Sequence, residues 1–355
     1  MNRLQDFFVF RQAKLSDQSE IMKFINDFWR PNHILGTDAD FFEYEHVNGS
    51  DINFFLAINK KTNSLSAIQG FISYEQVPNS HICGVMTKVS PLEKVPFLGV
   101  EIMRQMLKST NPKTYCGIGT NPKTMVPLVI KFFKRHVGIM SQYFFLNPSL
   151  SDFHIVKISK MHNNLLKEVQ SKKGIDKNYI RIADEKMISK NYDKLFFEKN
   201  LPRKSLEYVL KRYVYHPRYS YQNYLVYDPQ SGNKSLLVAR EVEHSGSTAL
   251  RIIDFIGDLN VLGKLNDWMK FITSKNCYEY VDLLCNGINQ QLIENSGFKL
   301  NLKDDNLIIP SYFEPFVYKN IDIYFEKSHK DLIIFKGDSD GDRPNIANGI
   351  VKAIN

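Results

Sequence analysis

The alternation of apolar and polar residues predicts short strands separated by amphipathic helices. Apolar and β-branched residues form short runs bounded by polar turns, as strands do, at residues 7–13, 53–59, 66–74, 81–88, 115–121 and 139–146. Apolar residues at helical spacing occupy residues 19–29, the segment after Gly99, and residues 123–134. The first helix is expected to break at Pro31 and to lead into a loop over residues 29–36. This order predicts a mixed sheet flanked by helices.

The same order of elements occurs a second time later in the chain. A helix is predicted at 205–213, strands at 222–227, 235–243, 249–256 and 279–285, and helices at 257–272 and 289–296. Residues 148–204 show no such pattern and are interpreted as a connector. Residues 331–335 are expected to form an edge strand. We therefore predict two domains of similar fold, 1–147 and 205–355, joined by the connector 148–204.

The segment from Val89 to Met103 runs from a predicted strand directly into a predicted helix. The first N–H groups of a helix have no partner within it, and the helix dipole favours negative charge at that end. We therefore expect a phosphorylated acyl carrier to bind here.

The element order of residues 7–147 resembles the acyl-CoA N-acyltransferase superfamily, the GNAT fold. The local match is Val89-Ser90-Pro91 followed by Lys94-Val95-Pro96-Phe97-Leu98-Gly99, against the pattern [Gln/Arg]-x-x-Gly-x-[Gly/Ala] at the helix start. Phe97 replaces the central glycine, and a phenylalanine does not allow the same close approach of the backbone to a diphosphate. The resemblance implies an α+β/α/β fold class: tandem GNAT folds, each a mixed, mostly antiparallel sheet flanked by helices, with acyl-CoA as co-substrate. The second copy lacks the Val-x-Pro and basic loop, so we interpret it as degenerate for coenzyme A and as contributing to the acceptor site.

The tail carries acidic residues at alternate positions, in KGDSDGDRPN from Lys336 to Asn345. An EF-hand calcium loop would need a Glu at its twelfth position, where residue 349 is Gly, so no metal site is predicted. The phrase resembles the closing motif of bacterial two-domain sugar N-acyltransferases, as do residues 29–35 and 309–320. That resemblance implies transfer of an acetyl or short hydroxyacyl group, such as 3-hydroxybutyryl, to a nucleotide-linked amino sugar. The expected acceptor is a dTDP-linked 3-amino-3,6-dideoxyhexose for O-antigen or capsule synthesis.

The resemblance also implies which residues hold the acyl-CoA. The backbone of Thr87, Val89 and Pro91 would line the acyl arm, and the helix start would take the diphosphate through Lys94, Phe97, Leu98 and Gly99. Asn121 would donate to the pantetheine amide, although capping the following helix is an equal alternative.

Acyl transfer to an amine also requires that the amine lose a proton. His33 is the first candidate for the base because it lies in the loop after the first helix, and Glu75 is the second. A structural histidine, a solvated carboxylate and proton loss directly to water remain open. The candidate acceptor-binding residues are Asn32, Tyr219, Tyr312, Asp340, Asp342 and Arg343. Arg343 would hold a diphosphate, unless the tail only orders a turn and pairs Arg343 internally.

Composition narrows the function classes. The 355 residues carry a formal charge of +8, but the basic residues are dispersed rather than gathered on one stretch, which disfavours nucleic-acid binding. No apolar run is long enough to span a membrane or serve as a signal peptide, and the four cysteines show no metal spacing, which suggests a cytoplasmic protein. Small-molecule partners are expected, and oligomerisation is left open. The alternatives are a Fem-type aminoacyl-tRNA-dependent transferase and a non-catalytic GNAT-like binding protein.

Overall fold

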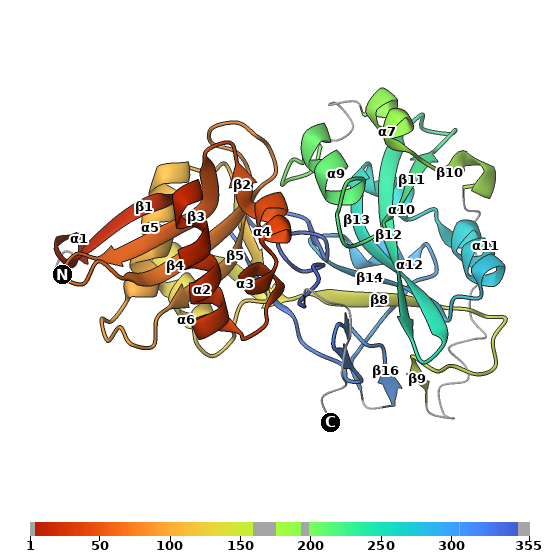
Figure 1. Cartoon of the computed structure of the whole chain (residues 1–355). Coiled ribbons are helices and arrows are strands. Elements are labelled where there is room, and N and C mark those ends of the chain that lie inside the picture. The colour runs from red at the N-terminus through yellow and green to blue at the C-terminus, as the bar shows by residue number, and fades with distance from the viewer. Residues whose placement is uncertain (1–3, 159–174, 193–198, 305, 347–355) are drawn as a thin grey trace. The chain divides into compact units, whose positions relative to one another are not determined.

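The computed structural model describes residues 4–158, 175–192, 199–304 and 306–346, which form two compact units (Figure 1). Of these residues, unit 1 holds 4–137, 325–329 and 339–346, and unit 2 holds the remainder. Each unit is built around one sheet of eight strands.

The sheet of unit 1 follows a path that is antiparallel in its first half. Its order is β1 (Phe8–Lys14), β3 (Asp51–Asn59), β4 (Leu65–Ser73), β5 (Ile82–Val89), β6 (Tyr115–Ile118), β19 (Tyr324–Lys327) and β7 (His136–Ile139), with β2 (Val47–Asn48) beside β3. The pairs from β1 to β5 are antiparallel, as is β6 with β19, whereas β5 and β6 are parallel.

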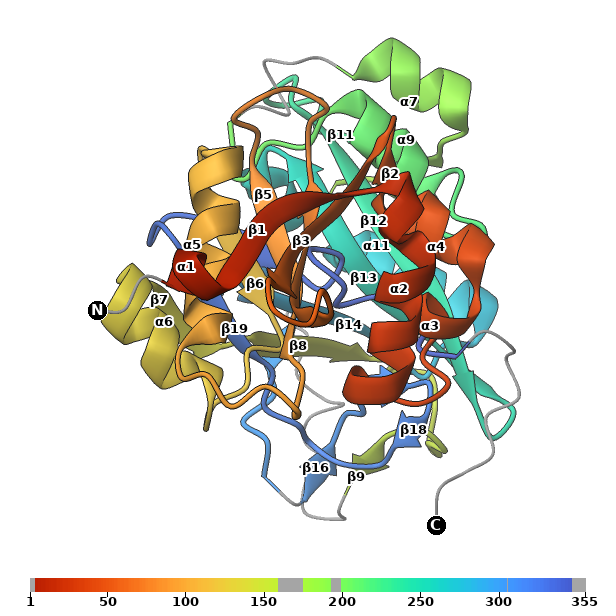
Figure 2. The same cartoon turned by 60° about the vertical axis from the view of Figure 1, so that its left-hand side comes forward.

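Helices cover both faces of this sheet. Successive side chains of a strand point to opposite faces, so neighbouring residues of one strand join different cores. Leu56 of β3 joins one apolar core, and its neighbours Phe55 and Ala57 join the other. The first core packs against α2 (Gln18–Phe24), a π-helical turn (Ile25–Trp29), α3 (Ile34–Thr37) and α4 (Ala39–His46). The second packs against α1 (Leu4–Phe7), α5 (Leu98–Thr110) and α6 (Met125–Phe133). Figure 2 shows α2 and α5 on opposite sides of the sheet.

The sheet of unit 2 repeats this pattern of pairing. Its order is β10 (Ile180–Ile182), β11 (Gln222–Tyr227), β12 (Lys234–His244), β13 (Ser247–Gly257), β14 (Tyr280–Asn286), β8 (Ser141–Leu146) and β15 (Lys299–Leu300), with β20 (Ile334–Phe335) also paired to β14. The pair β13–β14 is parallel, and it stands where β5–β6 stands in unit 1. The helices of this unit are α7 (Glu185–Asn191), α9 (Leu206–Tyr213), α10 (Leu259–Leu262), α11 (Asn266–Asn276) and α12 (Gln290–Glu294).

Two short ladders complete unit 2. They pair β9 (Lys157–Ile158) with β16 (Leu307–Ile308) and β17 (Tyr312–Phe313) with β18 (Phe316–Val317). No helix within the described ranges is long and apolar enough to cross a membrane.

The predicted architecture of two mixed, mostly antiparallel sheets flanked by helices is confirmed, but several elements differ from expectation. The predicted strand 139–146 corresponds to β8 from Ser141 onward, which belongs to the sheet of unit 2, whereas Ile139 is the last residue of β7 in the sheet of unit 1. The sixth place in the sheet of unit 1 is taken instead by β19, which was not predicted. The expected loop 29–36 contains the start of α3, and α4 was not predicted either. The expected edge strand 331–335 is β20, which lies against β14 rather than at a free edge.

The functional division into residues 1–147, 148–204 and 205–355 stays a prediction. The units place residues 138–147 with unit 2, and residues 325–329 and 339–346 with unit 1. Residues 159–174 and 193–198 of the expected connector, and 305 and 347–355 of the expected second domain, lie outside the described residues.

Candidate active site

The strands β5 and β6 separate after a short stretch of pairing. They pair only from Ile82 opposite Tyr115 to Gly84 opposite Gly117, although β5 continues to Val89. The opening between them, here called the first notch, holds a cavity of about 320 Å³. The cavity is lined by both strands, by the turn after β6 and by β19. Its lining residues include Gly84, Thr87, Lys88, Tyr115, Gly117, Asn121 and Glu326.

Beyond Gly84, no strand among the described residues pairs with β5 on the side of the notch. Ser90 donates its N–H to Ser66 of the neighbouring β4 region, at 2.8 Å. Because successive residues of a strand direct their N–H and C=O groups to opposite sides, Thr87 and Val89 direct theirs to the notch. The Thr87 hydroxyl is bonded to the side-chain oxygen of Gln69. Thr87 and Val89, two of the residues predicted to line an acyl arm, therefore direct their backbone to the notch, whereas Pro91 lies in the turn after β5.

Helix α5 begins close to this edge without a side-chain cap. Its N-cap is Phe97, which has a φ of +64°, in the left-handed region that normally favours glycine. The Phe97 ring lies against Phe132, at 5.5 Å between centroids. The backbone of Phe97 thus adopts a left-handed conformation at the position where the family pattern expects a glycine. The first N–H groups of the helix, at Leu98, Gly99 and Val100, have no acceptor within the helix.

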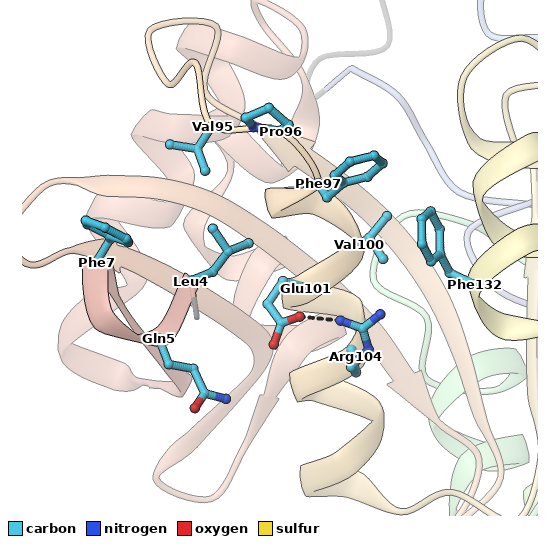
Figure 3. Close-up of a pocket in the computed structure, with 10 residues that line it drawn as sticks. All are labelled: Leu4, Gln5, Phe7, Val95, Pro96, Phe97, Val100, Glu101, Arg104 and Phe132. Atoms are coloured by element: carbon cyan, nitrogen blue, oxygen red, sulfur yellow. Dashed lines mark hydrogen bonds and ion pairs between the residues drawn. The ribbon is translucent and has the colours of Figure 1, made fainter. Parts of the chain in front are cut away.

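Beside this helix start lies a groove of about 610 Å³ (Figure 3). Its walls are mostly apolar and come from α1, the loop before α5, α5 itself and α6: Leu4, Phe7, Val95, Pro96, Phe97, Val100 and Phe132. Its cation, Arg104, is paired with Glu101 on the same helix. Lys94 is exposed and is not part of the groove. The groove is therefore suited to an apolar or aromatic group rather than to a bare anion.

The corresponding opening in unit 2 is filled by the chain itself. The parallel pairing of β13 with β14 extends only from Leu250 to Ile252 of β13. Beyond it, β20 pairs with β14, Lys336 donates its N–H to Leu284 at 3.0 Å, and Gly337 donates its N–H to Ile253 of β13 at 2.8 Å. The segment 334–338 therefore bonds to both strands where they diverge, and no peptide edge is left for a ligand there.

The helix after β13 also differs from its counterpart in unit 1. Asp258 caps α10, because its carboxylate accepts the N–H of Asn260 at 2.9 Å. A negative side chain thus holds the helix start at which unit 1 has an uncapped backbone. A phosphate would be repelled by this carboxylate.

The tail enters unit 1 at the closed end of the first notch. The Ser339 hydroxyl donates to the carbonyl of Gly84 at 2.9 Å. Four residues further on, Arg343 donates to Asp340 at 2.9 Å and to Glu45 at 3.0 Å, and its guanidinium lies 3.5 Å from Nε2 of His33. The structure therefore brings together His33, Asp340 and Arg343, three of the predicted residues, and adds Glu45. Two carboxylates already accept from Arg343, which disfavours it as the cation for a diphosphate.

His33 is buried within this group and has structural contacts. Its Nδ1 accepts the N–H of Leu35 at 3.2 Å and so caps α3. Burial first, and then the charge of Arg343, lower the pKa of His33 to about 3. An imidazole with such a pKa is neutral at pH 7 but a weak proton acceptor, so these contacts favour the structural role that the sequence left open.

The remaining predicted residues have separate surroundings. Glu75 pairs with Lys113 at 3.6 Å, at the end of β5 and β6 opposite to the notch. The side-chain oxygen of Asn121 accepts the N–H groups of Lys123 and Thr124 and so caps the turn into α6. Asn121 also lines the first notch. Asn32 is exposed and Asp342 is buried.

The two predicted tyrosines lie in unit 2. The Tyr219 ring stacks on His216, lies 3.9 Å from the Arg240 guanidinium, and its hydroxyl donates to Glu314. These contacts disfavour stacking of Tyr219 on a nucleotide base. Tyr312 is half-buried and near the ammonium of Lys336.

Sequence reasoning missed Glu326, which lines the first notch, and Ser339, which fixes the tail to it. The segment IDIYFEK from Ile321 to Lys327 alternates apolar and polar residues at its start, and this alternation was the available signal for a strand. No group of three or more His, Cys, Asp or Glu side chains in the described parts of the chain is placed to hold a metal ion.

Comparison with known proteins gives the fold-level context. No model of a known protein family matches the chain. No curated protein matches it either. Among solved structures, a GCN5-related N-acetyltransferase from Anabaena variabilis is similar with a TM-score of 0.49 and 10% identity, over 90% of this chain and 72% of that one. N-myristoyltransferase of Saccharomyces cerevisiae, solved with bound myristoyl-CoA, is similar with a TM-score of 0.46 and 10% identity, over 92% and 79%.

Proposed function

We propose that this chain is an N-acyltransferase that moves an acyl group from acyl-CoA to an amine at the first notch of unit 1. The observation that carries the proposal is the contrast between the two notches. In the first, no strand among the described residues pairs with β5 beyond Gly84 on the side of the notch, and this edge leads to the start of α5, which has no side-chain cap. The second is filled by residues 334–338 and its helix start is held by a carboxylate. One acyl carrier would therefore bind per chain.

The chemistry of the first notch suits a pantetheine thioester. The pantetheine arm contains amides, so it can pair with the N–H and C=O groups of Thr87 and Val89 as an added strand would. Its diphosphate would accept from the backbone at Leu98 to Val100, with the helix dipole favouring the charge. The adenine would pack in the apolar groove beside Phe97. Backbone N–H groups of β5 that do not pair with the pantetheine arm can stabilise the oxyanion that forms when an amine attacks the thioester.

The acceptor would approach from the tail, which is bonded to the closed end of the notch through Ser339. In the group formed by Glu45, Asp340 and Arg343, Asp340 would contact the ammonium or the hydroxyls of the acceptor. For the acceptor we keep a nucleotide-linked amino sugar, a dTDP-linked 3-amino-3,6-dideoxyhexose. It rests on the sequence resemblance of the tail and of residues 29–35, which contact one another through the N–H of Ile34 and the carbonyl of Asn345.

Hydrogen exchange with and without coenzyme A tests where the carrier binds. We expect slower exchange at the amides of Thr87, Val89 and Leu98 to Val100, with no change along β13 and β14, because the second notch is already filled. Release of free thiol, measured for a set of acyl-CoAs with dTDP-amino sugars, simple amines and no acceptor, then tests transfer. Protection of β13 instead of β5 would contradict the proposal, and absence of any protection would favour a non-catalytic protein.

A further inference from the structure

The strand β19 places one carboxylate at the closed end of the first notch. Glu326 stands opposite Gly117 of β6, and Gly117 in turn stands opposite Gly84 of β5, the last paired residue before the strands separate. A Cβ atom on Gly117 would lie 3.4 Å from Cγ of Glu326 and 3.6 Å from the carbonyl oxygen of Gly84. The side chain of Glu326 therefore lies where the two strands diverge, and it lines the cavity.

The carboxylate of Glu326 is buried, but few neighbouring groups stabilise its negative charge. Glu326 is only 4% exposed, and its Oε2 has no hydrogen-bond partner among the described residues. Its nearest cation is Arg135, whose Nε lies 3.9 Å from that oxygen, beyond hydrogen-bond distance. A structural carboxylate in such surroundings would normally accept several hydrogen bonds, as Glu279 of unit 2 does from the backbone at His154 to Val156. Glu326 has an acceptor oxygen without a hydrogen-bond partner among the described residues, and it lines a cavity. A hydrogen-bond donor on the substrate would explain both features.

We propose that Glu326 is the general base that removes a proton from the acceptor amine, an assignment that rests on the proposed acyl transfer at the first notch. The carboxylate takes one proton from the substrate ammonium, which leaves a neutral amine with a free electron pair. That pair forms the new C–N bond at the thioester carbonyl, and the C–S bond breaks with its electrons on sulfur. The second proton leaves the nitrogen and ends on the thiolate, giving coenzyme A, while the third stays on the amide. Glu326 then loses its proton to solvent.

The charges around Glu326 suit this role. Burial raises its pKa to about 7, while Arg135 acts in the opposite direction. A base with a pKa near the working pH combines a useful ionised fraction with real proton affinity. The other titratable groups that line the same cavity are the phenol of Tyr115, which burial keeps neutral by raising its pKa, and the ammonium of Lys88. Among the described residues that line this cavity, Glu326 is the one carboxylate.

The test is the pH dependence of kcat/KM in the full chain, with Glu326→Gln, Arg135→Gln and the control Glu43→Gln, which alters an exposed carboxylate of α4. In the unaltered protein kcat/KM should rise about tenfold per pH unit below pH 7 and then level off. Glu326→Gln should lower the plateau by about 10²–10⁴-fold and remove the rising limb. Arg135→Gln should move the limb to higher pH, because the lost cation favours the protonated acid. Glu43→Gln should match the unaltered protein.

Binding separates the possible failures. Glu326→Gln should still show a coenzyme A-dependent rise in melting temperature, since the carrier is held by β5 and α5. If the unaltered protein transfers acyl groups but Glu326→Gln keeps the limb, or Arg135→Gln leaves it in place, the assignment of the base is wrong and the proposed function stands. If the unaltered protein neither binds acyl-CoA nor releases thiol, both are wrong.

Discussion

Replacing Lys204 by Met should destabilise unit 2 strongly, because this lysine is a buried cation within the cluster that holds residues 334–338 in the second notch. Its Nζ lies 2.6 Å from Asp254 of β13 and 2.8 Å from Asp338, and both carboxylates are fully buried. Asp338 in turn accepts the N–H of Phe335 in β20 at 2.7 Å. Removing one partner of a buried ion pair costs about 3–5 kcal/mol, since the other charge is left uncompensated.

That loss corresponds to a fall in melting temperature of about 6–20 °C for a unit of this size. The assay is urea and thermal unfolding followed by the fluorescence of Trp268, which is buried in unit 2, in a Trp29→Phe background that removes the other tryptophan. Lys264→Met is the matched control. Lys264 pairs with Asp228 at 2.6 Å but is one-third exposed, so its loss should cost about 1 kcal/mol or less.

The pH dependence gives the reasoning a second check. Burial raises the pKa of Asp254 even with Lys204 present, and without the lysine this rise should be larger. A carboxyl whose pKa is higher in the folded than in the unfolded state binds its proton more tightly when folded, so acidification favours folding. The deficit of Lys204→Met should therefore shrink as the pH falls from 8 to 5, and adding Asp338→Asn should recover part of it. A loss below about 1 kcal/mol, or one that does not change with pH, would refute this account.

Three further substitutions test unit 1. Phe97→Val should cost about 1–2 kcal/mol because a β-branched residue is strained at a φ of +64°, whereas Phe97→Gly should be near neutral in chemical unfolding; equal losses would contradict the strained backbone. His33→Asn keeps a capping side chain for α3, so the limb of the pH–rate profile near pH 7 should persist, and its disappearance would restore His33 as the base. Gly84→Ala would bring a Cβ within 1.9 Å of the Tyr115 hydroxyl, and we expect a loss of about 1–3 kcal/mol that Tyr115→Phe partly relieves.

Sequence periodicity was sufficient for the elements that lie within one sheet. The strands 53–59 and 66–74 appear as β3 and β4 with ends shifted by at most two residues, and the helix expected after Gly99 is α5. Their apolar faces are set by burial against neighbours close in the chain, so local spacing carries the information. The helix start after Pro91 was found for the same reason.

Periodicity did not reveal which sheet a strand joins. The apolar run from Ile139 to Leu146 continues through Met140, whose N–H instead bonds to Ile323, and the chain passes there from the sheet of unit 1 to that of unit 2. The reciprocal strand, β19, returns from far along the sequence to pair with β6. Because Glu326 lies on that returning strand, a reading of the first domain by itself could not include it among the site residues.

One structural feature, the pairing of residues 334–338 with β13 and β14, accounts for two sequence observations. These are the missing phosphate-loop pattern of the second copy and the acidic motif of the tail. A notch whose strands are joined by residues 334–338 has no use for a helix start that attracts anions, so Asp258 can cap α10 at no functional cost. The tail phrase supplies the filling through Gly337, where a Cβ would lie 2.6 Å from the Tyr213 hydroxyl and 3.0 Å from the carbonyl of Ile253. The next residue but one, Ser339, already bonds to Gly84 of unit 1. The tail motif from Lys336 to Asn345 therefore begins with residues that fill the second notch and continues into residues proposed to bind the acceptor at the first notch.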